Sequence, residues 1–137
     1  MKIPVFGNGD VNSPEKAVEM RDVYGLDGAM IGRASIGNPW FFNQVKHYFK
    51  TGDNMPSPTI NERIEMAKRH LEMSIKWKGE KLGVLETRRH YSNYIKGIPD
   101  FKQYRTKMVT MNHSYEIFDL FEDLENKLVD TKLALQN

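Results

Sequence analysis

The chain has 137 residues, 39% of them hydrophobic, which is typical of a folded domain, and no apolar run approaches the roughly 20 residues of a membrane span. It contains no cysteine, which excludes disulfides, cysteine-ligated zinc and a cysteine nucleophile within these residues. The formal net charge is +2, but residues 63–107 carry twelve Lys and Arg against five Asp and Glu, whereas residues 108–137 carry two against six. The basic segment is a candidate contact surface for a polyanion such as nucleic acid, although solvated helix faces give the same pattern.

The first fifty residues alternate between strand and helix patterns. Residues 3–6 and 28–31 are short apolar runs, followed by Gly7 and Gly32, and both predict buried strands. Between them, Ser13-Pro14 is typical of an N-cap followed by proline at the first helical position. After the second run, Asn38-Pro39 has the same pattern and predicts a second helix. The predicted order is therefore βαβα.

Helical periodicity dominates the rest of the chain, after a linker predicted at residues 54–58, where prolines interrupt any apolar period. Thr59 and Glu62 can form a capping box at the start of a helix that ends near Gly79. Three further helices are predicted over about residues 83–96, over 101–111, and from an N-cap at Ser114. The sequence thus predicts a mostly α protein, with an α/β part at 1–53 and a C-terminal four-helix bundle at 59–137.

Two parallel strands do not make a stable sheet alone, because a parallel sheet needs helices on both faces and further strands at its edges. We therefore expect residues 1–53 to be the remnant of a larger α/β barrel of the TIM type. Its earlier strands would precede Met1 in a parent protein or come from another chain. A chain with such an open sheet edge is expected to self-associate.

Two glycine stretches follow the predicted strands and predict an anion site. In α/β barrels the loops after the last two strands commonly form a phosphate site. Gly7 and Gly9 would let backbone N–H groups approach an anion with no Cβ in the way. Gly32 is followed by Arg33, whose guanidinium can bind phosphate oxygens with two donors. A glycine after a strand is more often only a turn residue, but two such loops separated by one helix predict a phosphate site better than either alone.

The residues around these glycines resemble one family in particular. The matching segments are Ile3-Pro-Val-Phe-Gly-Asn-Gly-Asp-Val11, Gly25-Leu-Asp-Gly-Ala-Met-Ile-Gly-Arg-Ala34, Gly37-Asn-Pro-Trp-Phe41 and Thr87-Arg-Arg-His-Tyr-Ser-Asn-Tyr94. They resemble the C-terminal part of the tRNA-dihydrouridine synthases. The resemblance covers the last two β/α units of that family's FMN-binding barrel and its helical tRNA-binding domain.

The resemblance implies a cytoplasmic flavin enzyme that reduces uridine to 5,6-dihydrouridine in tRNA. Hydride would come from reduced FMN, a proton from a cysteine, and NADPH would be the reductant. The residues that would line the phosphate end of FMN are Asn8, Gly9, Asp10, Gly32 and Arg33. The catalytic cysteine and the earlier barrel strands are absent from this sequence, so we expect no catalytic residue here and no activity from this chain alone.

The same resemblance predicts an RNA surface, because a base inside folded RNA must be turned out to reach a flavin and the RNA must be held meanwhile. The residues assigned to it are Arg88, Arg89, His90 and Lys96. Tyr91 and Tyr94 are expected to be core residues instead, given their spacing. His70 and His113 lack partners at metal-ligand spacing, so no metal site is predicted.

Two alternatives to this interpretation are open. The helical part could act as an autonomous RNA-binding module, as the basic segment 63–107 suggests. The chain could also be a fragment of another FMN-dependent barrel dehydrogenase, of the dihydroorotate or inosinate type, although those enzymes do not require the helical half.

Overall fold

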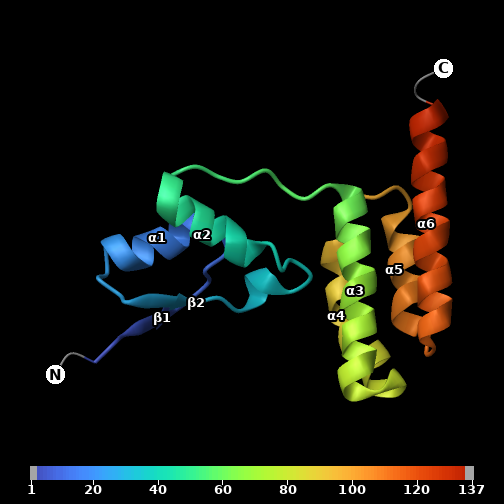
Figure 1. Ribbon diagram of the computed structural model, residues 1–137, viewed down its shortest axis with the longest axis horizontal. Helices are drawn as coiled ribbons and strands as arrows, with labels where there is room; N and C mark the ends of the chain where they lie inside the picture. The colour runs from blue at the N-terminus through green and yellow to red at the C-terminus, as the bar shows by residue number, and fades with distance from the viewer. Residues whose placement is uncertain (1–2, 135–137) are drawn as a thin grey trace. The chain divides into compact units, whose positions relative to one another are not determined.

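The protein is mostly helical, as Figure 1 shows. The computed structural model describes residues 3–134, and within them the chain forms six α-helices, one short 3-10 helix and a two-stranded parallel sheet. The chain divides into two compact units, Met1–Ser57 and Pro58–Asn137. The mostly helical content expected from the sequence is thus confirmed. No helix within residues 3–134 is long and apolar enough to cross a membrane.

The first unit has the predicted βαβα order. Its elements are β1 (Phe6–Asn8), α1 (Pro14–Asp22), β2 (Gly28–Met30), the 3-10 helix η1 (Arg33–Ser35) and α2 (Phe41–Thr51). The two strands are parallel and pair residues 6 to 8 with residues 28 to 30 in order. The predicted start of α1 is confirmed, because the Ser13 hydroxyl accepts a hydrogen bond from the Lys16 N–H at 3.2 Å and Pro14 is the first helical residue.

The prediction that both strands are buried is wrong. Ile3, Val5, Phe6 and Met30 are all more than half exposed. The core of this unit lies instead between the helices and the loops, and consists of Val11, Ala17, Met20, Phe41 and Val45. A sheet of two strands leaves both edges and much of its surface without neighbours, so an apolar sequence alone does not bury it.

The start of α2 also differs from the prediction. Asn38 and Pro39 form a turn rather than a cap, since the Phe41 N–H donates to the Asn38 carbonyl at 3.2 Å. The helix begins at Phe41, and Trp40 precedes it without a side-chain cap. At its other end, Gly52 adopts a left-handed conformation with φ of 77°, which favours glycine at a helix C-terminus.

The second unit contains four helices: α3 (Ile60–Lys78), α4 (Glu80–Tyr94), α5 (Phe101–Thr110) and α6 (Ser114–Ala134). Helix α3 packs along α4, α5 contacts α4 and α6, and α6 contacts α3. The buried residues come from all four helices: Ile64, Ala67, Leu71, Val84, Tyr91, Tyr94, Met108, Ile117, Phe121 and Leu124. The expected burial of the two tyrosines is confirmed, and the ring of Tyr91 meets Phe121 edge-on at 5.9 Å between centroids.

Two helices of this unit are capped in different ways, one by residues close in sequence and one by a residue far away in sequence. The predicted capping box is confirmed: Thr59 N–H donates to the Glu62 carboxylate at 2.7 Å, and Glu62 N–H donates to the Thr59 hydroxyl at 3.3 Å. Ser114 is the first residue of α6 rather than its N-cap. Its N–H and hydroxyl donate to the Glu80 carboxylate at 2.7 and 3.1 Å, so a side chain from α4 caps α6.

Helices α3 and α4 approach closely because of two glycines. Gly79 alone joins them, with φ of 81°, so α4 begins at Glu80 and not near residue 83 as predicted. Gly83 then packs against α3: a Cβ there would lie 2.7 Å from the backbone N and Cα of Ile75.

Gly83→Ala is expected to destabilise the helical unit by about 1–3 kcal/mol, because the new methyl group would overlap helix backbone that cannot move independently. In an open helix position the same change would stabilise by roughly 0.5–1 kcal/mol. Urea unfolding followed by far-ultraviolet circular dichroism measures the difference. Lys81→Ala, an exposed position on the same helix, is the control and should change stability by less than about 0.5 kcal/mol. A Gly83→Ala variant as stable as the parent chain would contradict the close approach.

Candidate functional site

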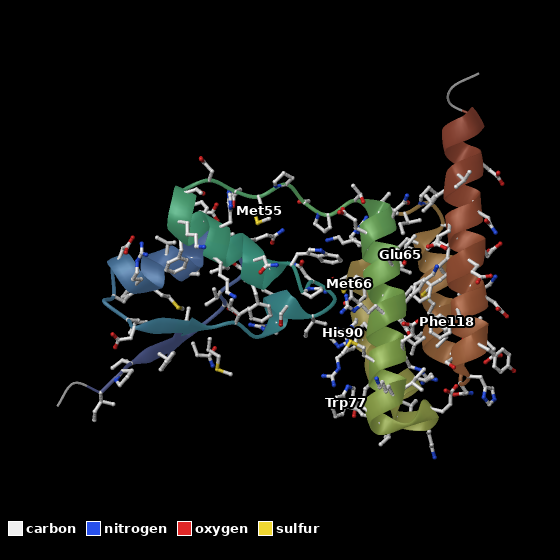
Figure 2. All side chains as sticks on the ribbon, in the orientation of Figure 1. Met55, Glu65, Met66, Trp77, His90 and Phe118 are labelled. Carbon is white, nitrogen blue, oxygen red and sulfur yellow. The ribbon has the colours of Figure 1, made fainter. Side chains whose placement is uncertain are left out.

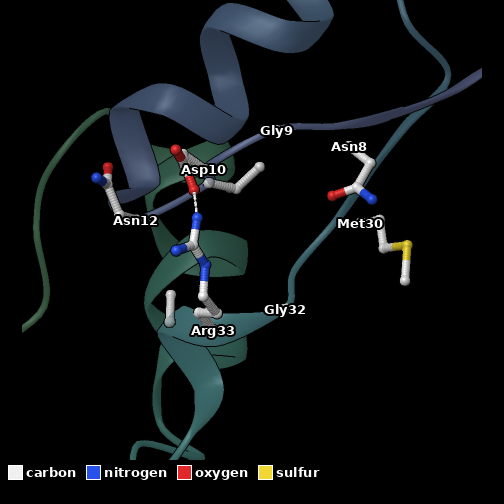
Figure 3. Close-up of a pocket in the computed structure, with 9 residues that line it drawn as sticks. Asn8, Gly9, Asp10, Asn12, Met30, Gly32 and Arg33 are labelled. Carbon is white, nitrogen blue, oxygen red and sulfur yellow. Dashed lines mark hydrogen bonds and ion pairs between the residues drawn. The ribbon is translucent and has the colours of Figure 1, made fainter.

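The two loops that contain Gly9 and Gly32 both lie at the C-terminal ends of the strands. Because β1 and β2 are parallel and Asn8 pairs with Met30, the residues that follow each strand leave the sheet on the same side. They line an open hollow of about 830 Å³, shown in Figure 3. Its lining residues are Asn8, Gly9, Asp10, Val11, Asn12, Met30, Gly32, Arg33 and Ala34. All five residues predicted for the phosphate end of FMN are therefore brought together.

The glycines of this region have different roles. A Cβ at Gly32 would have no atom within 4 Å, and one at Gly9 would reach only the methyl group of Met20 at 4.0 Å. These two glycines leave free space beside the backbone, as a bound anion requires. A Cβ at Gly7 would instead lie 2.3 Å from Leu26, so this glycine allows side-chain packing under the strand. Gly7 does not line the hollow, and its approach to an anion stays a prediction.

An ion pair joins the two loops. The Arg33 guanidinium donates through Nη2 to Oδ1 of Asp10, and both side chains are largely exposed. Asp10 has φ of 37°, in the left-handed region that residues other than glycine rarely adopt. Within residues 3–134 the Nε and Nη1 atoms of Arg33 make no hydrogen bond, so two of its three nitrogens remain available to a ligand. No local pattern in the sequence indicates this pairing, because the two residues are 23 positions apart in separate loops.

The four predicted RNA-binding residues are in different environments. Arg88 is partly buried, and its Nη2 donates to the Met111 carbonyl at 2.8 Å and to Oδ1 of Asn112 at 3.0 Å. It therefore holds the loop before α6. Arg89 and Lys96 are exposed, and neither side chain makes a hydrogen bond or ion pair in the described part of the chain. The structure thus leaves Arg89 and Lys96 accessible to a polyanion, while Arg88 is engaged within the protein.

His90 belongs to a small cluster between α3 and α4. Its ring lies 4.4 Å from that of His70, centroid to centroid, and Nδ1 of His70 is 3.1 Å from the Tyr94 hydroxyl. Burial, followed by the positive charges of His70 and Arg89, lowers the pKa of His90 to about 4. Burial also lowers the pKa of His70 and raises that of Tyr94 to about 12. At neutral pH His90 is uncharged, so it adds no positive charge to this part of the helical unit.

Two loops at the carboxyl edge of parallel strands, with free space at glycine and an available arginine, are typical of α/β proteins that bind anionic ligands at that edge. Comparison with known proteins identifies which class this is. The model of the dihydrouridine synthase (Dus) family matches residues 1–131. The chain therefore belongs to the dihydrouridine synthase family, and the match favours this family over the FMN-dependent barrel dehydrogenases considered from the sequence.

Individual relatives agree with the family match. The probable tRNA-dihydrouridine synthase of Rickettsia conorii is 33% identical over 131 residues, which cover 96% of this chain and 40% of the relative. The tRNA-dihydrouridine synthase B of Pseudomonas putida is 38% identical over 107 residues, which cover 78% of this chain and 32% of the relative. The probable tRNA-dihydrouridine synthase 1 of Synechocystis is 34% identical over 135 residues, which cover 98% of this chain and 37% of the relative. The chain spans only 32 to 40% of the length of these relatives.

Proposed function

We propose that this chain is the C-terminal part of a cytoplasmic tRNA-dihydrouridine synthase. In this proposal the first unit is the last two β/α units of an FMN-binding TIM barrel, and the second is a four-helix tRNA-binding bundle. The whole enzyme would reduce uridine in tRNA to 5,6-dihydrouridine, with NADPH as reductant. The observation that carries the proposal is the joining of Gly9, Asp10, Gly32 and Arg33 around one hollow, in a chain that belongs to this family.

The residues around the hollow fit the phosphate end of FMN. Gly9 and Gly32 leave space beside the backbone, and Arg33 has two available nitrogens that suit phosphate oxygens. Asp10 would hold the Arg33 guanidinium in place by accepting a hydrogen bond from Nη2. This contact also places a negative charge near the anion. When bound, FMN supplies the hydride for the uridine C5–C6 double bond. The walls for its ring system would come from other parts of the barrel.

Catalysis would require residues beyond this chain. The sequence contains no cysteine, so the proton donor that the resemblance implies must come from the rest of the whole protein. Two loops alone offer few contacts, and we expect FMN to bind the isolated chain no more tightly than about 1 mM. The chain by itself is therefore proposed to be inactive.

A chimera tests the flavin proposal. Replacing the matched C-terminal segment of the Pseudomonas putida relative with this chain should give a protein that purifies with bound flavin and forms dihydrouridine in tRNA. Arg33→Ala in the chimera should weaken flavin affinity by about 10- to 100-fold, because a charge-assisted hydrogen bond is lost. Lys46→Ala, an exposed position on α2, removes the same charge away from the hollow and is the matched control.

Flavin absorbance of the purified chimera and titration with FMN provide the readouts. A folded chimera without flavin would count against the cofactor proposal. Equal flavin affinity in the Arg33→Ala and Lys46→Ala variants would show that Arg33 does not contribute to flavin binding.

The tRNA proposal is tested on this chain. It should bind tRNA with an affinity that falls steeply as salt rises, because phosphate contacts release counterions. Arg89→Ala and Lys96→Ala should each reduce the slope of log affinity against log salt by about 1. Arg88→Ala is the contrasting variant: it should lower folding stability, since Arg88 holds Met111 and Asn112. Binding that is absent or insensitive to salt would refute the proposed surface.

We also propose that the isolated chain self-associates through its open sheet. Both strands have a free edge, and the exposed apolar residues there are Ile3, Val5, Phe6 and Met30. Sedimentation at increasing concentration should show dimers or larger species, and the double variant Phe6→Ser/Met30→Ser should shift them towards monomer. Tyr115→Ser, which removes an exposed ring from α6, is the control. A chain that stays monomeric throughout would be evidence against the proposal.

A further inference from the structure

A partly exposed apolar stripe runs along α3, outside the core of the helical unit, with Met66 half-buried and Met73 and Trp77 exposed. Met66, Met73 and Trp77 are spaced by seven and four residues, which places them on one face of the helix. Met73 is 49% exposed, and Trp77 is 78% exposed, the highest value among the large hydrophobic residues of the described chain. Figure 2 shows Met66 and Trp77 on the same side of α3. Exposed apolar surface of this kind, with polar residues around it, marks interaction sites.

The core-facing stripe of α3 is a different one. Ile64, Ala67 and Leu71 are fully buried and follow their own helical spacing. Trp77 lies in the last turn of α3, two residues before Gly79, and no aromatic ring or cation stacks on it within residues 3–134. With 78% of its surface exposed, the indole is available for a contact from outside the chain.

The backbone that carries Trp77 is well fixed. Gly83 of α4 contacts the backbone of α3 at Ile75, two residues before Trp77, and Lys78 forms an ion pair with Glu86. An indole presented from such a position loses little entropy when it binds a partner.

Unpaired cations accompany this stripe. Arg69 and Lys76 lie on the same face, three and ten residues after Met66, and both are exposed. Neither makes an ion pair in the described part of the chain, whereas Lys78 is already paired with Glu86. Two acidic residues of α3 lie near these cations: Glu65, which pairs with Lys68, and Glu72, which lies between Arg69 and Lys76 on the helix. A flat aromatic ring beside free cations is complementary to unpaired nucleotides, since bases stack on the ring and phosphates meet the cations.

We infer that Trp77 is a stacking platform for an unpaired base of the RNA substrate, with Arg69 and Lys76 contacting phosphates next to that base. This inference rests on the proposed tRNA-binding function and specifies the RNA class that this surface recognises: unpaired nucleotides and not a duplex. Stacking on Trp77 tolerates any base, because every base has a flat face. The surface therefore contributes affinity with little preference for sequence.

The test uses this chain with three RNA probes: tRNA, an unstructured single strand and a duplex of the same length. Trp77→Ala should weaken binding of tRNA and of the single strand by about 5- to 100-fold and leave duplex binding nearly unchanged. Trp77→Phe keeps a stacking ring and should retain most of the affinity. Tyr115→Ala removes another exposed ring and is the control, with no change expected.

Tryptophan fluorescence provides a second readout. The chain contains two tryptophans, so the signal of Trp77 is the difference between the parent chain and Trp77→Phe. Single-stranded RNA should quench this difference signal, and duplex RNA should not.

Four results would overturn the inference. Salt-sensitive tRNA binding that Trp77→Ala leaves intact would refute stacking on Trp77 while the proposed tRNA-binding function stands. Equal quenching by the duplex would refute recognition of unpaired bases. A blue-shifted Trp77 signal that no RNA changes would show that protein covers the ring. The absence of any tRNA binding would refute both the inference and the proposed function on which it rests.

Discussion

The parallel pairing of β1 with β2 is the interaction on which the candidate site depends. With Asn8 opposite Met30, the two following loops leave the sheet together, and Asp10 comes within reach of Arg33. A shift of one residue in this register would turn the side chains of one strand to the opposite face and separate the loops. The register is supported by the small core between α1, α2 and the loops, so the geometry of an exposed site depends on a few buried residues.

A sheet of only these two strands leaves apolar side chains of the first unit exposed. Parallel sheets are normally covered on both faces, yet the apolar side chains of Val5, Phe6 and Met30 are exposed. The chain also spans only 32 to 40% of the length of its relatives. Both facts support the proposal that these strands belong to a larger barrel, whose other strands would cover the exposed residues and supply the walls of a flavin site.

Features that depend on neighbouring residues could be predicted from the sequence, whereas features that depend on distant partners could not. The Ser13 cap, the capping box of Thr59 with Glu62, and the burial of Tyr91 follow from local spacing. The Glu80 carboxylate that caps α6 comes from a residue 34 positions earlier, and no local pattern indicates it. For the site, glycine loops after strands identified the region, but the ion pair across it depends on how two separate loops are arranged in space.

The basic segment shows how structure changes the meaning of a charge count. Several of its cations are already used within the protein: Arg63 donates to the Lys96 carbonyl, Arg88 holds Met111, and Lys68 pairs with Glu125. The excess of positive charge over residues 63–107 therefore overstates what is available to RNA. Seven cations of this segment remain exposed, and their side chains make no hydrogen bond or ion pair in the part of the chain that the structure describes: Arg69, Lys76, Lys81, Arg89, Lys96, Lys102 and Lys107. Affinity for a polyanion should thus follow these free cations, together with the exposed rings near them, more closely than the net charge of the segment.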